Sequence, residues 1–126
     1  MRIENNILHI SVNDFQLCDI INGRKKCILI PINSTNAPIL INMDAEGNPI
    51  IKNSLVLPIP YSKILFYSTH ITLKGENCLV KVNKISPHYY KKHNICEVSP
   101  FYGHELCFDL GVVEKCSTKT DYFTKK

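Results

Sequence analysis

The chain has 126 residues, and its 15 lysines and arginines against 11 aspartates and glutamates give it a net charge of +4. This length fits one domain and excludes a two-domain cofactor enzyme, so we expect no cofactor. No apolar run approaches the roughly 20 residues that cross a bilayer, and the N-terminus lacks the apolar core of a signal peptide. We therefore expect a cytoplasmic protein without a membrane partner.

Six cysteines are spread along the chain, and no two of them have the Cys-x-x-Cys spacing. The sequence thus gives little support to a zinc ribbon or a thioredoxin-type site. Most of the cysteines lie in apolar or alternating runs, and free cysteine packs as a small apolar residue. We expect buried, reduced thiols at Cys18, Cys27, Cys78, Cys96, Cys107 and Cys116.

The N-terminal part of the sequence predicts a strand, a helix and a second strand. Residues 7–12 are rich in branched apolar side chains, as in strands. Asn13, three residues before a glutamine, has the form of a capping box, and apolar residues at helical spacing predict a helix over about 14–22. Gly23 supplies the helix stop, and the apolar run 27–32 predicts the next strand.

Residues 33–60 contain many turn formers and form an insertion in the pattern. Within it, two apolar runs flank a polar connection that contains a glycine, which predicts a hairpin over about 39–51.

The rest of the chain predicts further strands. Residues 64–67 are apolar and aromatic, and residues 78–85 alternate as in a strand with one wet face. Residues 86–103 lack a clear period and predict a long loop, and residues 106–113 predict the last strand. Residues 117–126 are expected to be a flexible C-terminal tail that follows a single domain over residues 1–116.

Five or six short, mostly antiparallel strands with one N-terminal helix and a hairpin insertion predict an α+β domain built on a small β-barrel or a strongly curved sheet.

The order of these segments resembles the ASCH family of the PUA-like superfamily. The resemblance rests on a helix with a Gly-x-Lys turn over residues 15–25, the strand after it, and the segments 61–67, 78–85 and 107–113. It implies a PUA-like/ASCH β-barrel with a cleft beside the Gly-x-Lys turn. In that cleft the resemblance implies noncatalytic binding of RNA or a modified nucleotide.

One group in this family is hydrolytic and removes the acyl group of acetylated cytidine with a lysine, a threonine and a glutamate. Carried over, the lysine falls on Lys25 and the threonine on Ile28, and a position where many members have arginine falls on Ile30. Glu97 and Glu105 are the candidates for the glutamate. Isoleucine can neither act as a nucleophile nor transfer a proton. The resemblance therefore favours a binding domain, with Lys25 as the catalytic candidate if the chain is an amidohydrolase acting on an acylated nucleoside such as N4-acetylcytidine.

Three segments carry candidate ligand contacts. The cations after the predicted helix can hold phosphate, although a helix C-terminus favours cations by itself. The residues that follow the strand over 64–66, beginning with Tyr67, add hydroxyls and an aromatic ring, although an ordinary strand end has the same composition. Residues 88–93 interleave aromatic rings with cations, as in single-stranded nucleic-acid surfaces, and also as in many exposed loops. The nucleic-acid-binding candidates are Arg24, Lys25, Lys26, Tyr67, Ser68, Thr69, Tyr89, Tyr90, Lys91 and Lys92.

Two further hypotheses concern other ligands. His88, His93, Cys96 and His104 offer three imidazoles and a thiol, but their spacing matches no compact zinc motif, so we expect no metal. The apolar Ile28 and Ile30, with the insertion over 33–60, also fit a small phage or mobile-element accessory protein that binds a protein partner.

Overall fold

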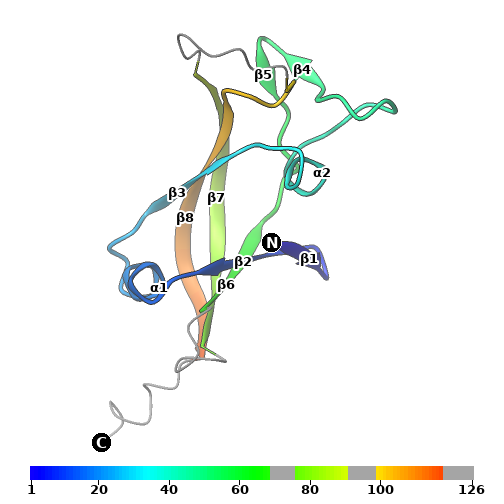
Figure 1. Cartoon of the computed structure of the whole chain (residues 1–126). Coiled ribbons are helices and arrows are strands. Elements are labelled where there is room, and N and C mark those ends of the chain that lie inside the picture. Colours follow the sequence, from blue (N-terminus) through cyan, green and yellow to red (C-terminus); the bar gives the residue numbers. More distant parts are fainter. Residues whose placement is uncertain (69–75, 91–98, 118–126) are drawn as a thin grey trace, which may run out of the picture. The chain divides into compact units, whose positions relative to one another are not determined.

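The computed structural model describes residues 1–68, 76–90 and 99–117. Figure 1 labels the strands and helices of these residues: β1 (Arg2–Glu4), β2 (Ile7–Val12), α1 (Asp14–Ile21), β3 (Cys27–Pro31), α2 (Ala37–Leu40), β4 (Ile51–Lys52), β5 (Leu55–Val56), β6 (Lys63–Ser68), β7 (Asn77–Tyr89) and β8 (His104–Ser117). None of the helices in these residues is long and apolar enough to cross a membrane.

Six of the strands form one mixed sheet in the order β1-β2-β6-β7-β8-β3, and β4 pairs with β5 separately. β2 and β6 are parallel, whereas β1 with β2, β6 with β7, and β3 with β8 are antiparallel. This mostly-strand fold with two helices in the described residues is compatible with the predicted α+β class, but the sheet is not closed into the predicted barrel. Closure needs β1 to pair with β3, yet β1 has three residues and β3 ends at Pro31, which lacks a backbone N–H.

The helix α1 begins and ends where its sequence signals place it. The side chain of Asn13 accepts a hydrogen bond from the backbone N–H of Gln16 at 2.9 Å, and the Gln16 side chain accepts one from the Asn13 N–H at 3.4 Å. This confirms the predicted capping box. Gly23 follows with a φ of +75°, as expected at a helix stop.

The described residues belong to two compact units. Unit 1 draws its residues from Met1–Lys26, Tyr61–Asn83 and Leu110–Lys126, and unit 2 from Cys27–Pro60 and Lys84–Asp109.

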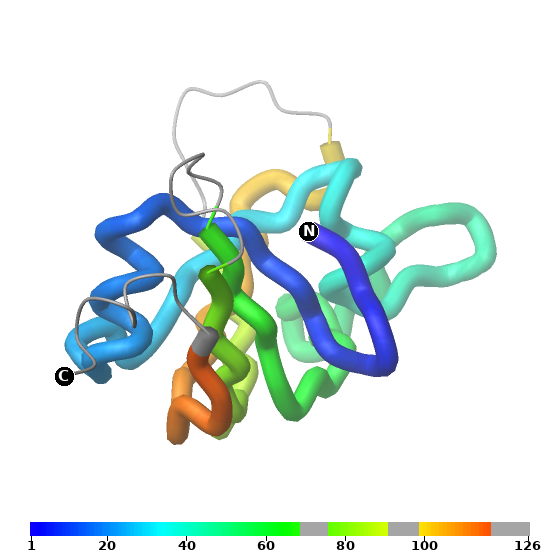
Figure 2. Tube along the Cα trace, turned by 90° about the horizontal axis from the view of Figure 1, so that it is seen from below, coloured from blue at the N-terminus to red at the C-terminus, as the bar shows by residue number. Residues whose placement is uncertain are grey.

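In unit 1, the N-terminal hairpin turns at Asn5 and Asn6, so that β1 lies beside β2 (Figure 2). The inner faces of β2, β6 and β7 form its core together with α1. Their alternating side chains are buried there: Leu8, Ile10, Val12, Leu17, Ile20, Ile64, Phe66, Cys78, Val80 and Val82.

In unit 2, the core gathers apolar residues from β3, from β8 and the turn before it, and from the segment between β3 and β6. Buried members include Ile28, Ile30, Ile32, Ala37, Leu40, Ile41, Val56, Phe101, Leu106 and Phe108. Ile28 pairs with Phe108 and Ile30 with Leu106 in the β3–β8 ladder.

The hairpin predicted over 39–51 is confirmed in part. The chain turns at residues 44–48 with Gly47 at a φ of +84°, and Met43 pairs with Pro49 in an antiparallel bridge. The short helix α2 takes the place of the start of its first strand, because Pro38 in the first turn of that helix supplies a helical φ without needing a donor. A second hairpin follows between β4 and β5, with Asn53 and Ser54 at positive φ in its turn. The predicted loop over 86–103 is shorter than expected, because β7 continues to Tyr89.

Asn13→Ala should lower the free energy of unfolding by about 1 kcal/mol, because it leaves the Gln16 N–H without its capping acceptor. Asn13→Asp retains an acceptor and should stay near the wild-type value. Urea unfolding of the three proteins checks this, and an equal loss in both variants would show that the cap contributes nothing specific.

Candidate nucleic-acid interface

The basic turn, which we define as Arg24, Lys25 and Lys26, follows α1 in unit 1. The backbone N–H groups of Arg24 and Lys25 both donate to the carbonyl oxygen of Asp19, at 2.8 and 3.0 Å. Arg24 Nε also donates to Asp19 Oδ1 at 3.0 Å, and this hydrogen bond and ion pair raise the pKa of Arg24 above its ordinary value. Since Asp19 balances the charge of Arg24, Lys25 and Lys26 are the cations that the basic turn offers to a phosphate.

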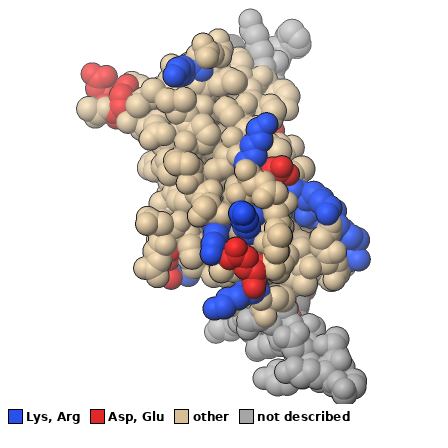
Figure 3. All heavy atoms as spheres, turned by 180° about the vertical axis from the view of Figure 1, so that it is seen from behind, with Lys and Arg blue, Asp and Glu red and all other residues tan. Residues whose placement is uncertain are grey.

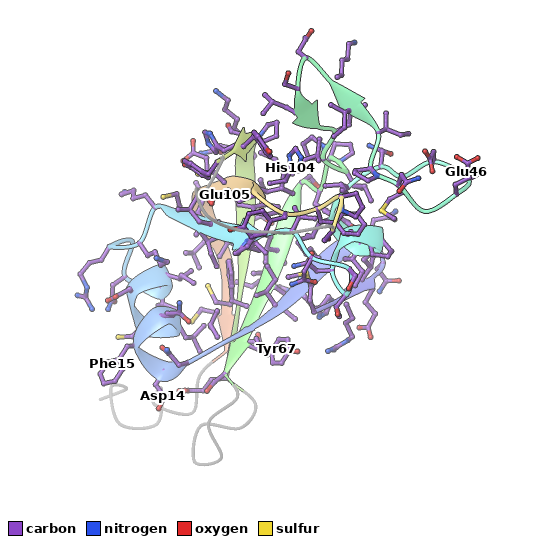
Figure 4. The ribbon with its side chains drawn as sticks, turned by 45° about the horizontal axis from the view of Figure 1, so that its top comes forward. Asp14, Phe15, Glu46, Tyr67, His104 and Glu105 are labelled. Carbon is purple, nitrogen blue, oxygen red and sulfur yellow. The ribbon has the colours of Figure 1, made fainter. Side chains whose placement is uncertain are left out.

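Tyr67 and Ser68 lie on opposite faces of β6, so they do not form one binding surface. Ser68 is buried and its hydroxyl donates to Asp14 Oδ1 at 3.1 Å. Tyr67 is half-buried, and the guanidinium of Arg2 lies 5.5 Å from the centre of its ring. Figure 4 labels Asp14 at the start of α1 and Tyr67 on β6. Thr69 lies outside the described residues.

The hairpin of β1 and β2 adds charged groups near Tyr67 that the sequence analysis missed. Arg2 Nε lies 3.6 Å from Glu4 Oε2, and His9 Nε2 lies 3.9 Å from Glu4 Oε1. His9 is buried, and its Nδ1 has no hydrogen-bond partner among the described residues. The cluster depends on the β1–β2 register, which pairs Arg2 with His9, and the sequence shows no local signal for that pairing.

Cations and carboxylates are mixed on the face of the protein in Figure 3. Unit 1 also contains an ion pair in which Lys63 Nζ lies 2.7 Å from Glu114 Oε1. Lys63 also faces Lys81 directly across the β6–β7 ladder. The carboxylate of Glu114 thus lowers the cost of two like charges at this pair.

The most exposed aromatic group of unit 2 lies at the end of β7. We define the aromatic surface as His88, Tyr89, Tyr90 and His104. The rings of His88 and Tyr90 are stacked, with their centres 6.3 Å apart and their planes 28° apart. The ring of Tyr89 lies against that of His104, with centres 4.5 Å apart. Tyr89 and Tyr90 remain 47% and 49% exposed, so their rings stay accessible to a ligand.

The turn before β8 holds the aromatic surface in place. Gly103 has a φ of +86°, and its carbonyl oxygen accepts a hydrogen bond from the N–H of Tyr90 at 2.6 Å. A Cβ at this position would overlap the carbonyl oxygen of Tyr90 and lie 2.9 Å from Cε1 of Tyr89. The buried Phe101 anchors the same turn, because its carbonyl oxygen accepts from the N–H of His104 at 3.1 Å. Gly103 therefore has both a conformational and a steric reason to be glycine.

His104 combines an aromatic contact with a buried polar atom. Its Nδ1 is buried without a hydrogen-bond partner among the described residues, and burial lowers the pKa of the imidazole below its ordinary 6.5. Figure 4 labels His104 and the neighbouring Glu105 at the start of β8. The neutral ring packs on Tyr89 without the cost of burying a charge.

Several of the predicted site residues cannot be placed. Lys91, Lys92, His93 and Cys96 lie outside the described residues, and so does Glu97. Within the described part of the chain, no three His, Cys, Asp or Glu side chains converge as a metal site would require.

The prediction that the cysteines are buried is wrong for most of the described thiols. Cys18, Cys27 and Cys116 are exposed, Cys107 is half-buried, and among the described cysteines only Cys78 is buried. An apolar run does not specify which of its alternate residues faces the core, and that is why the sequence pattern misplaced Cys27.

Ile28 and Ile30, the positions that differ from the hydrolytic pattern, point into the core of unit 2 and are each 8% exposed.

No protein-family model, curated protein or solved structure matches this chain.

Replacing Gly103 tests whether the turn contact organises the aromatic surface. Gly103→Ala should lower the free energy of unfolding by about 2 to 4 kcal/mol, because the methyl group adds overlap to the strain of a positive φ. Gly47 has a similar φ of +84° but open space around it, so Gly47→Ala should cost only about 1 kcal/mol. Equal losses in urea unfolding would contradict the contact.

The lowered pKa of His104 predicts a pH dependence of stability. Because the unfolded imidazole binds its proton at a higher pH than the folded one, the free energy of unfolding should fall as pH drops through 6.5. His104→Phe keeps a ring against Tyr89 and removes the titration. Urea unfolding at pH 7.5 and 5.5 should show a smaller fall for the variant, and the same fall in both proteins would refute the assignment.

Proposed function

We propose that this chain binds single-stranded RNA, or a nucleotide of it, through the aromatic surface. The observation that carries the proposal is the half-exposure of Tyr89 and Tyr90 on a backbone that Gly103 fixes. Exposed rings lose little freedom on binding when the chain beneath them is already ordered. A pre-ordered aromatic platform is the usual means by which proteins hold unpaired bases.

The stacked pair of His88 and Tyr90 supports a base as the ligand. A flat, exposed π-face accepts any base by stacking, an interaction worth about 1 to 3 kcal/mol per base. In a double helix the bases are already stacked on each other and are not available to these rings. The aromatic surface therefore favours unpaired strands over duplexes.

A cation on the same strand supports a phosphate contact. Lys84 is exposed and lies four residues before His88, so strand alternation places both side chains on one face of β7. Their separation along the strand is about 13 Å at roughly 3.3 Å per residue. That spacing lets Lys84 contact a backbone phosphate of an RNA molecule whose base stacks on His88 and Tyr90. In unit 1, Lys25 and Lys26 add a positive field that attracts a polyanion.

The resemblance to the ASCH family of the PUA-like superfamily is part of this proposal, since it implies RNA or a modified nucleotide as the ligand. The strand, helix and strand at residues 7–31 and the mixed sheet are compatible with the α+β class that the resemblance implies, although the sheet does not close into its barrel. The hydrolytic alternative has less support. Ile28 and Ile30 occupy the core, where they offer no group that transfers a proton to or from Lys25.

Tyr90→Ala should weaken binding of a short, fluorescently labelled single-stranded RNA of mixed sequence by about tenfold, because it removes one stacking face. Tyr90→Phe keeps the face and should bind within about twofold of the wild type. The measurement is fluorescence anisotropy at low salt, and affinity should fall as salt rises.

Phe15→Ala is the matched control. Phe15 is an exposed aromatic side chain, 83% accessible, at the start of α1 in unit 1 (Figure 4). Phe15→Ala should leave the RNA affinity unchanged. If it weakens binding as much as Tyr90→Ala does, or if neither substitution changes the affinity, the aromatic surface is not the binding site.

A further inference from the structure

Two thiols lie on the same face of the β3–β8 ladder in unit 2. Cys27 faces Asp109 across the ladder and Leu29 faces Cys107, so Cys27 and Cys107 are diagonal neighbours. Cys27 is exposed and Cys107 is half-buried, whereas Ile28 between Cys27 and Leu29 points into the core. The two sulfur atoms are therefore together on the accessible side of the sheet.

The two thiols lie at non-hydrogen-bonded positions of the β3–β8 ladder, where facing strands come closer together. Lys26 accepts a backbone hydrogen bond from Leu110, and Ile32 donates one to His104, so residues of even number in β3 form the hydrogen-bonded pairs. Cys27 and Leu29 consequently occupy the other, non-hydrogen-bonded positions. At such positions the facing Cα atoms are about 4.5 Å apart, against about 5.5 Å at hydrogen-bonded ones.

We propose that Cys27 and Cys107 form a redox-active dithiol that closes to a disulfide when it meets a low-molecular-weight disulfide such as oxidised glutathione. This is a covalent regulatory site, separate from the aromatic surface and independent of the RNA-binding proposal.

The reaction has two exchange steps. The Cys27 thiol loses its proton to solvent, and its sulfur attacks one sulfur of oxidised glutathione, which breaks that disulfide and releases one reduced glutathione. The sulfur of Cys107, also deprotonated, then attacks Cys27 Sγ in the mixed disulfide and releases a second glutathione. Two cysteine thiols are oxidised and one glutathione disulfide is reduced.

The surroundings of the two thiols give the order of the steps. Burial raises the pKa of Cys107, and the Cys27 thiol and the carboxylates of Asp109 and Glu105 raise it further. A thiol with a raised pKa is a poor first nucleophile in solution. The exposed Cys27 is better placed to meet the reagent, and Cys107 then acts on a sulfur that is already beside it.

The position of β3 at the end of the sheet makes the Cys27–Cys107 disulfide strained and easy to reduce. Diagonal neighbours are separated by about 7 to 8 Å, more than the usual Cα span of a disulfide, so β3 must shift toward Cys107 when the bond closes. Among the described residues, β3 is an end strand of its sheet and pairs with β8 alone, so it can shift at the cost of one ladder. Strained and exposed disulfides of this kind are the easily reduced ones.

Cys116 also lies near another thiol, Cys78, but that pair is not open to a reagent on both sulfur atoms. Cys78 is fully buried, and burial raises its pKa to about 12, so oxidised glutathione does not reach it. Cys18 is exposed, but its polar contacts are the Asn22 amide and the Arg24 guanidinium. We therefore expect Cys18 to form only a mixed disulfide with glutathione.

The test treats the folded, full chain with oxidised glutathione, blocks the remaining thiols with an alkylating agent, and maps the products by mass spectrometry. Digestion after glutamate separates Cys107 from Cys96, because Glu97 and Glu105 lie between them. The expected product is a Cys27–Cys107 cross-link that excess reduced glutathione reopens. Cys107→Ser should instead leave a stable glutathione adduct on Cys27.

Cys18→Ser is the matched control and should form the same cross-link in the same yield as the wild type. A wild-type chain that carries glutathione on Cys27 without the cross-link would overturn the proposal. Cross-linking of Cys27 to any other cysteine, or a cross-link that forms in urea as readily as in the folded protein, would overturn it as well.

Discussion

Side chains alternate between the two faces of every strand in this protein, and this alternation determines which of them a ligand can reach. In β3 it buries Ile28 and Ile30 and exposes Cys27. In β6 it turns Ser68 inward to Asp14 and leaves Tyr67 on the outer face. Adjacent residues of one strand therefore face opposite sides of the sheet, whereas residues from paired strands can share a face. The two thiols Cys27 and Cys107 come together in this way across β3 and β8, and in the aromatic surface Tyr89 on β7 lies against His104 on β8, while His88 stacks with Tyr90 two residues along.

The aromatic surface depends on a second constraint, the tight approach of the turn at Gly103 to the end of β7. One short hydrogen bond fixes the backbone of Tyr90, and the absence of a Cβ lets the Tyr89 ring lie over the turn. The rings are thereby held on ordered backbone while about half of their surface stays in solvent. Such pre-organisation lowers the entropic cost of stacking a base, and that saving is the physical basis of the proposed affinity.

Local patterns predicted the elements whose signals lie within a few residues. The cap at Asn13, the stop at Gly23 and the apolar run of β3 place α1 and its flanking strands correctly. The same patterns failed where pairing between distant segments decides the structure. The extension of β7 to Tyr89 depends on its partner near Gly103, and the open sheet depends on the ends of β1 and β3. Tyr89 and Tyr90 were found by composition, whereas the roles of Gly103 and His104 follow from contacts that no sequence period encodes.

The most direct test of the account is photocrosslinking of the full chain to a uridine-containing single-stranded RNA at low salt, with the adducts located by mass spectrometry. Irradiation joins a base to the side chain on which it stacks, so it identifies the contact without changing the protein. The account predicts adducts on Tyr89 or Tyr90, and their loss in competition with excess unlabelled single strand but not with duplex. Adducts confined to Tyr67 and the N-terminal hairpin, or no adduct at all, would contradict it.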